Sequence, residues 1–92
     1  MSSRPSAKDV LKFLGVDDTE LLPELRREGL FEAEELSPEE AEELRMAATL
    51  IRELGVNPAG VGVILHMRRR LLFLEERMRE TLRRLLDDVE NR

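Results

Sequence analysis

The C-terminal part of the chain decides the fold: residues 57–89 read NPAGVGVILHMRRRLLFLEERMRETLRRLLDDV. Asn57 followed by Pro58 is a typical helix start, because an Asn side chain can accept from the first free backbone N–H groups and proline is tolerated at the first helical position. From residue 59 the apolar pattern continues without a stop to about residue 89. The sequence therefore predicts one helix of roughly thirty residues, about 45 Å long.

Large apolar residues recur along this predicted helix at a strict spacing of seven, the repeat of a coiled coil. The repeat is Ile64, Leu71, Met78 and Leu85, and a second apolar set flanks it: Leu65, Leu72, Leu82, Leu86 and Val89. A helix this long exceeds what a small domain can cover, so its distal half is expected to need a partner helix. We predict self-association through Ile64, Leu71, Met78, Leu82 and Leu85; the alternative is a helix that folds back on its own domain.

Two short helices are predicted before residue 30. Ser6 followed by Asp9 forms the pattern of a capping box, and the helix that it starts is expected over residues 7–14. Asp17 followed by Glu20 repeats the pattern for a second helix, with Pro23 in its first turn or two, where a missing N–H is best tolerated. Two short helices joined by a tight turn have the length and spacing of a helix-turn-helix.

A third helix is predicted over residues 38–54. Ser37, Pro38 and Glu40 form the strongest helix start in the chain, since the serine caps, the proline occupies the first helical position and the glutamate completes the capping box. The apolar face expected for this helix is Leu44, Ala47, Ala48, Ile51 and Leu54.

The predicted fold class is therefore all-α. Residues 1–56 are expected to form a short helix-turn-helix unit followed by the third helix, and residues 57–92 a long C-terminal helix able to form a coiled coil. A chain of 92 residues has room for one hydrophobic core, so we predict that both parts belong to a single structural unit.

The residue types argue against an enzyme and predict no cofactor and no metal. The chain contains no Cys, which excludes disulfides and thiolate sites and fits a reducing cytoplasm. Its one histidine, His66, is flanked by Leu65 and Met67 and is expected to be half-buried or at an interface. The polar start and the absence of a long apolar run predict neither a signal peptide nor a membrane span, so a cytoplasmic protein is expected.

Charge is distributed unevenly. Residues 17–43 contain twelve acidic residues and two arginines, a formal charge of −10 within a chain of net −5. Such a segment opposes nucleic acid and invites a basic partner, although a purely solubilising surface is an equal alternative. The residues predicted to contact a partner are Glu20, Glu24, Glu28, Glu32, Glu34, Glu35, Glu39 and Glu43.

The one basic cluster is the run of arginines at residues 68–70. Three successive residues on a helix spread over about 200°, so they do not form one basic stripe. We expect surface ion pairs with Glu75 and Glu76, and phosphate contact is the less favoured alternative.

Several stretches resemble the MerR family in order and spacing: Gly15-Val16, LRREGL at residues 25–30 and LIRELGV at residues 50–56. More narrowly, LGVNPAGVGVIL at residues 54–65, followed by MRR at residues 67–69, is similar to the chaperone-modulator proteins of the CbpM and DafA type. The resemblance spans about residues 7–78. It departs from MerR regulators at residues 31–36, which are too few for a β-hairpin wing and contain no base.

The resemblance implies a protein that binds the J-domain of a DnaJ-type co-chaperone, either alone or together with DnaK, and that either modulates or assembles this chaperone system. J-domains of such partners carry a basic helix, which an acidic surface would complement. Two alternatives remain open: a MerR-like DNA-binding regulator, and a regulatory partner that pairs with one through the long helix.

Overall fold

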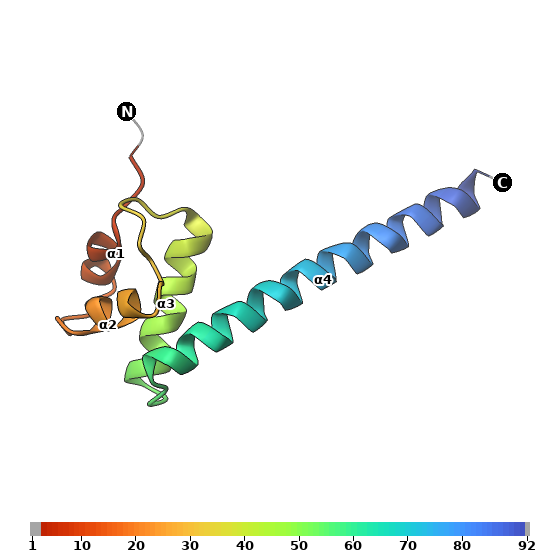
Figure 1. The fold of residues 1–92 in the computed structure, drawn as a ribbon. Helices are drawn as coiled ribbons and strands as arrows, with labels where there is room; N and C mark the ends of the chain where they lie inside the picture. The colour runs from red at the N-terminus through yellow and green to blue at the C-terminus, as the bar shows by residue number, and fades with distance from the viewer. Residues whose placement is uncertain (1–2, 92) are drawn as a thin grey trace.

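The computed structural model describes residues 3–91, which form four helices: α1 (Ala7–Phe13), α2 (Leu21–Arg27), α3 (Pro38–Arg52) and α4 (Pro58–Glu90). Met1 and Ser2, at the start of the predicted N-terminal unit, and Arg92, at the end of the predicted C-terminal helix, lie outside the described residues. The described residues contain no β-strand, so the predicted all-α class is confirmed. Three short helices gather at one end, and α4 projects from them (Figure 1).

Local capping chemistry starts three of the four helices as predicted. At α1, Asp9 N donates to Ser6 Oγ and Ser6 N donates to Asp9 Oδ2, both at 3.1 Å. The same box begins α3, where Glu40 N donates to Ser37 Oγ at 3.1 Å. At α4 the Gly60 N–H donates to the side-chain oxygen of Asn57 at 2.7 Å.

The predicted start of α2 is wrong. The helix begins at Leu21, and Glu20 at the capping position makes no side-chain cap. Instead, Asp18 Oδ1 accepts from Glu20 N at 2.9 Å, which forms a turn before the helix. Pro23 is the physical reason: it is the third residue of α2, where no intrahelical acceptor waits for its missing N–H, whereas an earlier start would place it in the helix interior.

The predicted end of α3 is two residues too late. The helix ends at Arg52, and Gly55 adopts a left-handed φ of 69°, which glycine tolerates without strain. The Val56 N–H then donates to Leu50 O at 2.9 Å and closes the turn. Leu54, predicted on the apolar face, is consequently 68% exposed.

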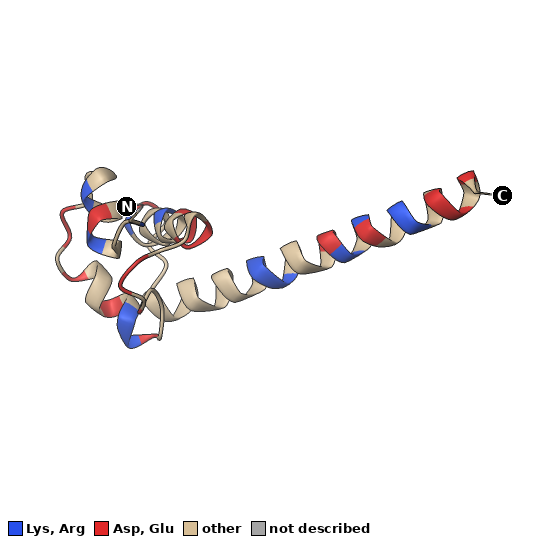
Figure 2. Ribbon diagram, turned by 90° about the horizontal axis from the view of Figure 1, so that it is seen from above, with Lys and Arg blue, Asp and Glu red and all other residues tan. Residues whose placement is uncertain are grey.

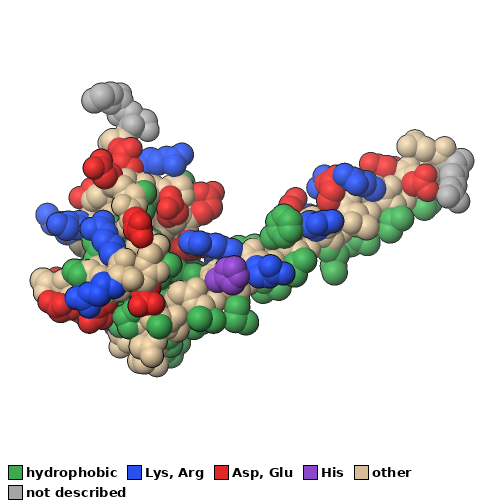
Figure 3. Space-filling model, viewed as in Figure 1, with side chains coloured by type: hydrophobic (Ala, Val, Ile, Leu, Met, Phe, Trp, Pro, Cys, Tyr) green, Lys and Arg blue, Asp and Glu red, His purple; other side chains and the backbone are tan. Residues whose placement is uncertain are grey.

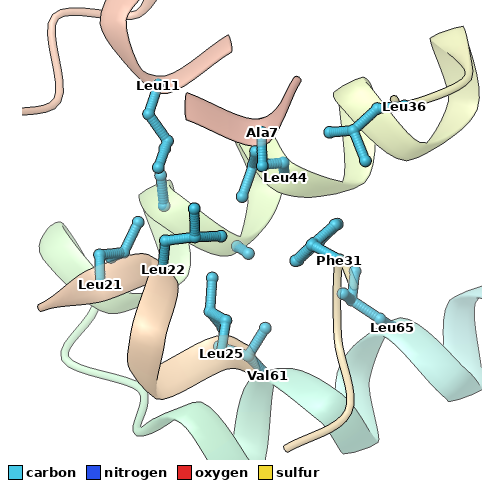
Figure 4. Close-up of a cluster of buried hydrophobic side chains, with 12 residues drawn as sticks. Ala7, Leu11, Leu21, Leu22, Leu25, Phe31, Leu36, Leu44, Val61 and Leu65 are labelled. Atoms are coloured by element: carbon cyan, nitrogen blue, oxygen red, sulfur yellow. The ribbon is translucent and has the colours of Figure 1, made fainter. Parts of the chain in front are cut away.

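All four helices and the connector at residues 31–36 contribute to one hydrophobic core. Its buried side chains are Ala7, Leu11, Leu21, Leu22, Leu25, Phe31, Leu36, Leu44, Ala47, Ala48, Val61 and Leu65. Figure 4 shows Leu25 next to Val61 and Phe31 beside Leu65, which joins α2 and the connector to α4. Packing of this kind, rather than helix propensity, holds helices as short as α1 and α2 in place.

The connector is a fixed loop. Phe31 has a φ of 55°, unusual for a residue with a side chain, and its ring is buried. Arg26 Nε donates to its carbonyl at 3.2 Å, and the Leu36 N–H donates to Pro5 O at 2.8 Å. The loop is therefore held at both ends, by contacts with the core and with the extended segment that precedes α1.

Only the first two turns of α4 belong to the core, through Val61 and Leu65. We call α1, α2, α3, their connections and α4 as far as Leu65 the head, and residues 66–90 of α4 the arm. The described molecule measures 60 × 36 × 21 Å, an elongated shape for 92 residues. The boundary between the packed head and the projecting arm thus lies inside α4, about nine residues after the boundary predicted between residues 56 and 57.

Candidate partner-binding surfaces

The predicted acidic residues fall into two groups on the head, with both signs of charge following along the arm (Figure 2). The first group follows α2, where Glu20 precedes the helix, Glu24 lies within it and Glu28 ends it. The three recur every four residues along one line, about 100° around the axis from the buried leucines; Glu20 and Glu28 are exposed and Glu24 is half-buried. Glu32 extends this group, because its Oε1 lies 3.6 Å from where a Cβ of Gly29 would be. We call Glu20, Glu24, Glu28 and Glu32 the acidic row.

The second group follows the connector into α3. Glu34, Glu35 and Glu39 are exposed. The neighbouring Glu40 is committed to its cap: hydrogen bonds from the Ser37 backbone N–H and hydroxyl lower the pKa of its carboxyl. Hydrogen bonding to Arg45 likewise lowers the pKa of Glu42. Glu40 and Glu42 therefore already have partners within the chain.

Glu43 differs from the other predicted contact residues, since its side chain is only 6% exposed and is bound to other parts of the chain. Arg69 Nε donates to Glu43 Oε2 at 2.8 Å, and Arg69 Nη2 donates to Oε1 at 2.6 Å. This two-pronged hydrogen bonding raises the pKa of Arg69. Glu43 is therefore a tie between α3 and α4, and we leave it out of the proposed binding surface.

The predicted pairing of residues 68–70 with Glu75 and Glu76 is wrong. Arg69 reaches Glu43, and Arg68 Nη1 approaches the same carboxylate at 3.8 Å. Glu76 pairs with Arg79 at 2.9 Å instead. The cause is tertiary: α4 crosses α3 and brings together residues 26 positions apart, which local spacing cannot reveal.

A groove of about 720 Å³ separates the start of α3 from α4. Glu39, Glu40 and Glu42 line one wall, while Arg68, Arg69 and Leu72 line the other. Its charge is therefore mixed. The acidic row is the better surface for a basic partner, because Arg27 is the one base among the residues that line the hollow beside Glu24 and Glu28.

Along the arm the predicted oligomerisation residues form a continuous exposed stripe. Leu71, Met78, Leu82 and Leu85 are each between 55 and 67% exposed, and Ile64 begins the stripe half-buried at the edge of the head. Figure 3 shows hydrophobic side chains along one side of α4 and charged ones along the other. We call these five residues the apolar stripe; exposed apolar surfaces of this kind are typical of protein–protein contact sites.

The opposite flank of the arm is held by charge pairs and one ring contact. Glu80 pairs with Arg83 at 2.6 Å and with Arg84 at 3.4 Å. The Arg77 guanidinium lies over the ring of Phe73, 5.8 Å from its centroid. The sequence prediction missed this contact, although the four-residue spacing of Phe73 and Arg77 on a helix is a signal for it.

His66 is exposed in the described chain, so of the two positions predicted for it the half-buried one is wrong and the interface one stays a prediction. Among residues 3–91, no group of three His, Asp or Glu side chains could hold a metal ion. Within the same range, even the 33-residue α4 does not combine the length and apolar character that a membrane span requires.

Comparison with protein-family models, with curated proteins and with solved structures returns no match. The chain's own surfaces and the local resemblance of residues 54–69 therefore carry the functional proposal.

Proposed function

We propose that the protein is a chaperone modulator that binds the J-domain of a DnaJ-type co-chaperone. The acidic row is the observation that carries this proposal. Glu20, Glu24 and Glu28 repeat about every 6 Å along α2, the rise of four helical residues. A basic helix with lysine or arginine at the same spacing would meet these carboxylates in register, and J-domains carry a basic helix.

The charge of the row is little reduced by its neighbours on α2. Arg26 is exposed but donates through Nε to Phe31 O, so Arg27 is the other exposed base on this helix. A single exposed ion pair contributes about 0–1 kcal/mol, so binding requires several carboxylates to act together. Such binding weakens with salt, because exposed charges are screened over about 10 Å at 0.1 M.

The proposed mechanism involves no chemistry. By covering the basic helix of the J-domain, the head would compete with DnaK for it, or would hold the co-chaperone in a complex with DnaK. DnaK is thus a partner in the second arrangement and a competitor in the first.

The apolar stripe supplies the second part of the proposal, self-association. Burying one Leu or Met side chain contributes about 1.5–3 kcal/mol, and each copy would bury the four exposed members of the stripe, with Ile64 at their edge. An oligomer joined through the arms would present more than one acidic row, which increases apparent affinity for an oligomeric co-chaperone.

The acidic row disfavours the MerR-like DNA-binding alternative. The second helix of a helix-turn-helix enters the major groove in such regulators, and carboxylates at this position repel phosphate. Pairing with a full-length MerR protein through the arm remains the alternative for the apolar stripe, and it predicts mixed oligomers.

The test is co-elution with an isolated J-domain from the same organism, by size exclusion with light scattering at low and moderate salt. The variant Glu20→Gln/Glu24→Gln/Glu28→Gln removes three charges from the row. Its matched control, Glu75→Gln/Asp87→Asn/Glu90→Gln, removes three charges from the arm.

We expect the row variant to weaken J-domain binding by at least about tenfold and the control by less than about threefold. Equal losses in both variants would mean that net charge, and not the row, governs binding. No co-elution at either salt concentration would reject the J-domain proposal.

A further inference from the structure

A third surface lies on the arm, about 120° around the helix axis from the apolar stripe. His66, Arg70, Phe73 and Arg77 follow one another at spacings of four, three and four residues, which places them in one line on α4. All four are exposed. In Figure 3 the single histidine, in purple, lies between basic side chains on this side of the arm. We call these four residues the basic stripe.

Its arginines differ from the others on the arm. Arg79, Arg83 and Arg84 each pair with Glu76 or Glu80. By contrast, no carboxylate among residues 3–91 pairs with Arg70 or Arg77 within 4.0 Å. Their charge is therefore available to a partner.

Phe73 adds an apolar contact point between the two arginines. Its side chain is 61% exposed and takes no part in the core, yet Arg77 covers one face of its ring. An exposed aromatic flanked by cations is a common composition of binding hot spots, because the ring supplies area and the guanidinium supplies directed charge.

We propose that the basic stripe binds a helical segment of a second partner protein, rich in Asp and Glu and carrying one large apolar side chain. Arg70 and Arg77 are seven residues apart, about 10.5 Å along the axis. Another helix has the same rise, so carboxylates seven residues apart on it would meet both guanidinium groups. The apolar side chain between them would lie on Phe73.

The surroundings of the stripe favour a short acidic helix over nucleic acid. An extended polyanion would run from the stripe past Glu76 and Glu80 or toward the acidic head, and its further phosphates would be repelled there. A helix with carboxylates on one face matches the limited length of the stripe.

The proposal does not rest on J-domain binding. If both hold, however, the chain joins a basic partner on the head to an acidic partner on the arm. It would then act as an adaptor between two proteins of opposite charge.

The probe is a fluorescein-labelled peptide of roughly twenty residues, long enough to be partly helical, with glutamates four and three residues apart and one leucine. Binding to the full chain is followed by fluorescence anisotropy at low salt. Arg70→Glu/Arg77→Glu and Phe73→Ala alter the stripe. Arg79→Glu/Arg83→Glu is the control, with the same charge change on another side of the same helix; circular dichroism verifies the helicity of each variant.

We expect the stripe double variant to weaken peptide binding by at least about tenfold, Phe73→Ala by about threefold, and the control by less than about threefold. The acidic-row variant should still bind the peptide, and the stripe variants should still bind the J-domain.

Three results would overturn the proposal: no peptide binding at low salt, equal losses in stripe and control variants, or tighter binding of a single-stranded oligonucleotide of equal charge that the same stripe substitutions abolish.

Discussion

The tie between Glu43 and Arg69 allows a quantitative prediction, because its two partners are buried to different extents. Glu43 is nearly inaccessible, whereas the Arg69 side chain is 56% exposed. Replacing Arg69 by Met removes the guanidinium and leaves a buried carboxylate with only Arg68 nearby, at 3.8 Å. Replacing Glu43 by Gln removes the buried charge and leaves an arginine that water can hydrate.

Removing one partner of a fully buried ion pair costs about 3–5 kcal/mol. Because Arg69 is more than half exposed, we discount this figure and expect Arg69→Met to lower the free energy of unfolding by about 2 kcal/mol. Glu43→Gln should lower it by about 1 kcal/mol, since the amide can keep one of the two hydrogen bonds. The double variant should lose about 1 kcal/mol less than the sum of the single losses, which is the coupling between the partners.

The assay is urea denaturation followed by far-ultraviolet circular dichroism at neutral pH. All variants must be compared at one protein concentration, because self-association would add to apparent stability by mass action. Additive losses, or a loss below about 0.5 kcal/mol for Arg69→Met, would refute the assignment of this pair as the tie between α3 and α4.

Three further predictions concern the arm, the start of α4 and the capping boxes. Leu71→Asp/Met78→Asp should convert an oligomer into a monomer in light scattering while the head stays folded; a parent protein that is already monomeric would contradict the apolar stripe. Gly60→Ala should destabilise the fold by about 1 kcal/mol despite alanine's helix propensity, because the added Cβ would lie 2.9 Å from Val56 Cγ1 and 3.2 Å from Asn57 Oδ1. Its control, Gly62→Ala, meets Leu30 Cδ1 only at 4.0 Å and should stabilise by about 0.5–1 kcal/mol in thermal melts. Hydrogen bonds lower the pKa of Asp9 and Glu40 in the folded state. These bonds therefore stabilise the fold fully above the unfolded pKa values, near about 4, and the stabilisation is lost as pH falls through the lower pKa values of the folded state. Ser37→Ala should cost about 1 kcal/mol at neutral pH and make unfolding less sensitive to acid, and an unchanged acid limb in this variant would contradict the role of Glu40.

Local chemistry made most of the fold predictable from the sequence. Three helices are capped by the side chains of Ser6, Ser37 and Asn57. Each accepts a hydrogen bond from the backbone N–H three residues later, so the pattern that predicts it lies within one helical turn. The start of α2 was misjudged because the capping pattern was weighed without the stricter steric demand of Pro23.

The remaining features depend on contacts between residues far apart in the sequence. Phe31 and Leu36 are buried because the connector crosses the core. The acidic composition of the connector gave no sign of this burial in the sequence. Glu43 has the same local appearance as Glu39, and only the crossing of α4 over α3 distinguishes the two. Of the predicted surface residues, those on α2 were the easiest to place, because the four-residue spacing fixes a helix face without tertiary information.

The uninterrupted helix α4 is also a lever. Its arm extends about 38 Å beyond Leu65, whereas Arg69, where the tie to Glu43 acts, lies only about 6 Å from that pivot. A rotation of the helix by about 10° at the head would therefore move its far end by about 7 Å, and a load at the far end would act on the tie with roughly sixfold mechanical advantage. The bond between Glu43 and Arg69 thus adds to the packing of Val61 and Leu65 in fixing the angle at which the distal half of the molecule is presented to a partner.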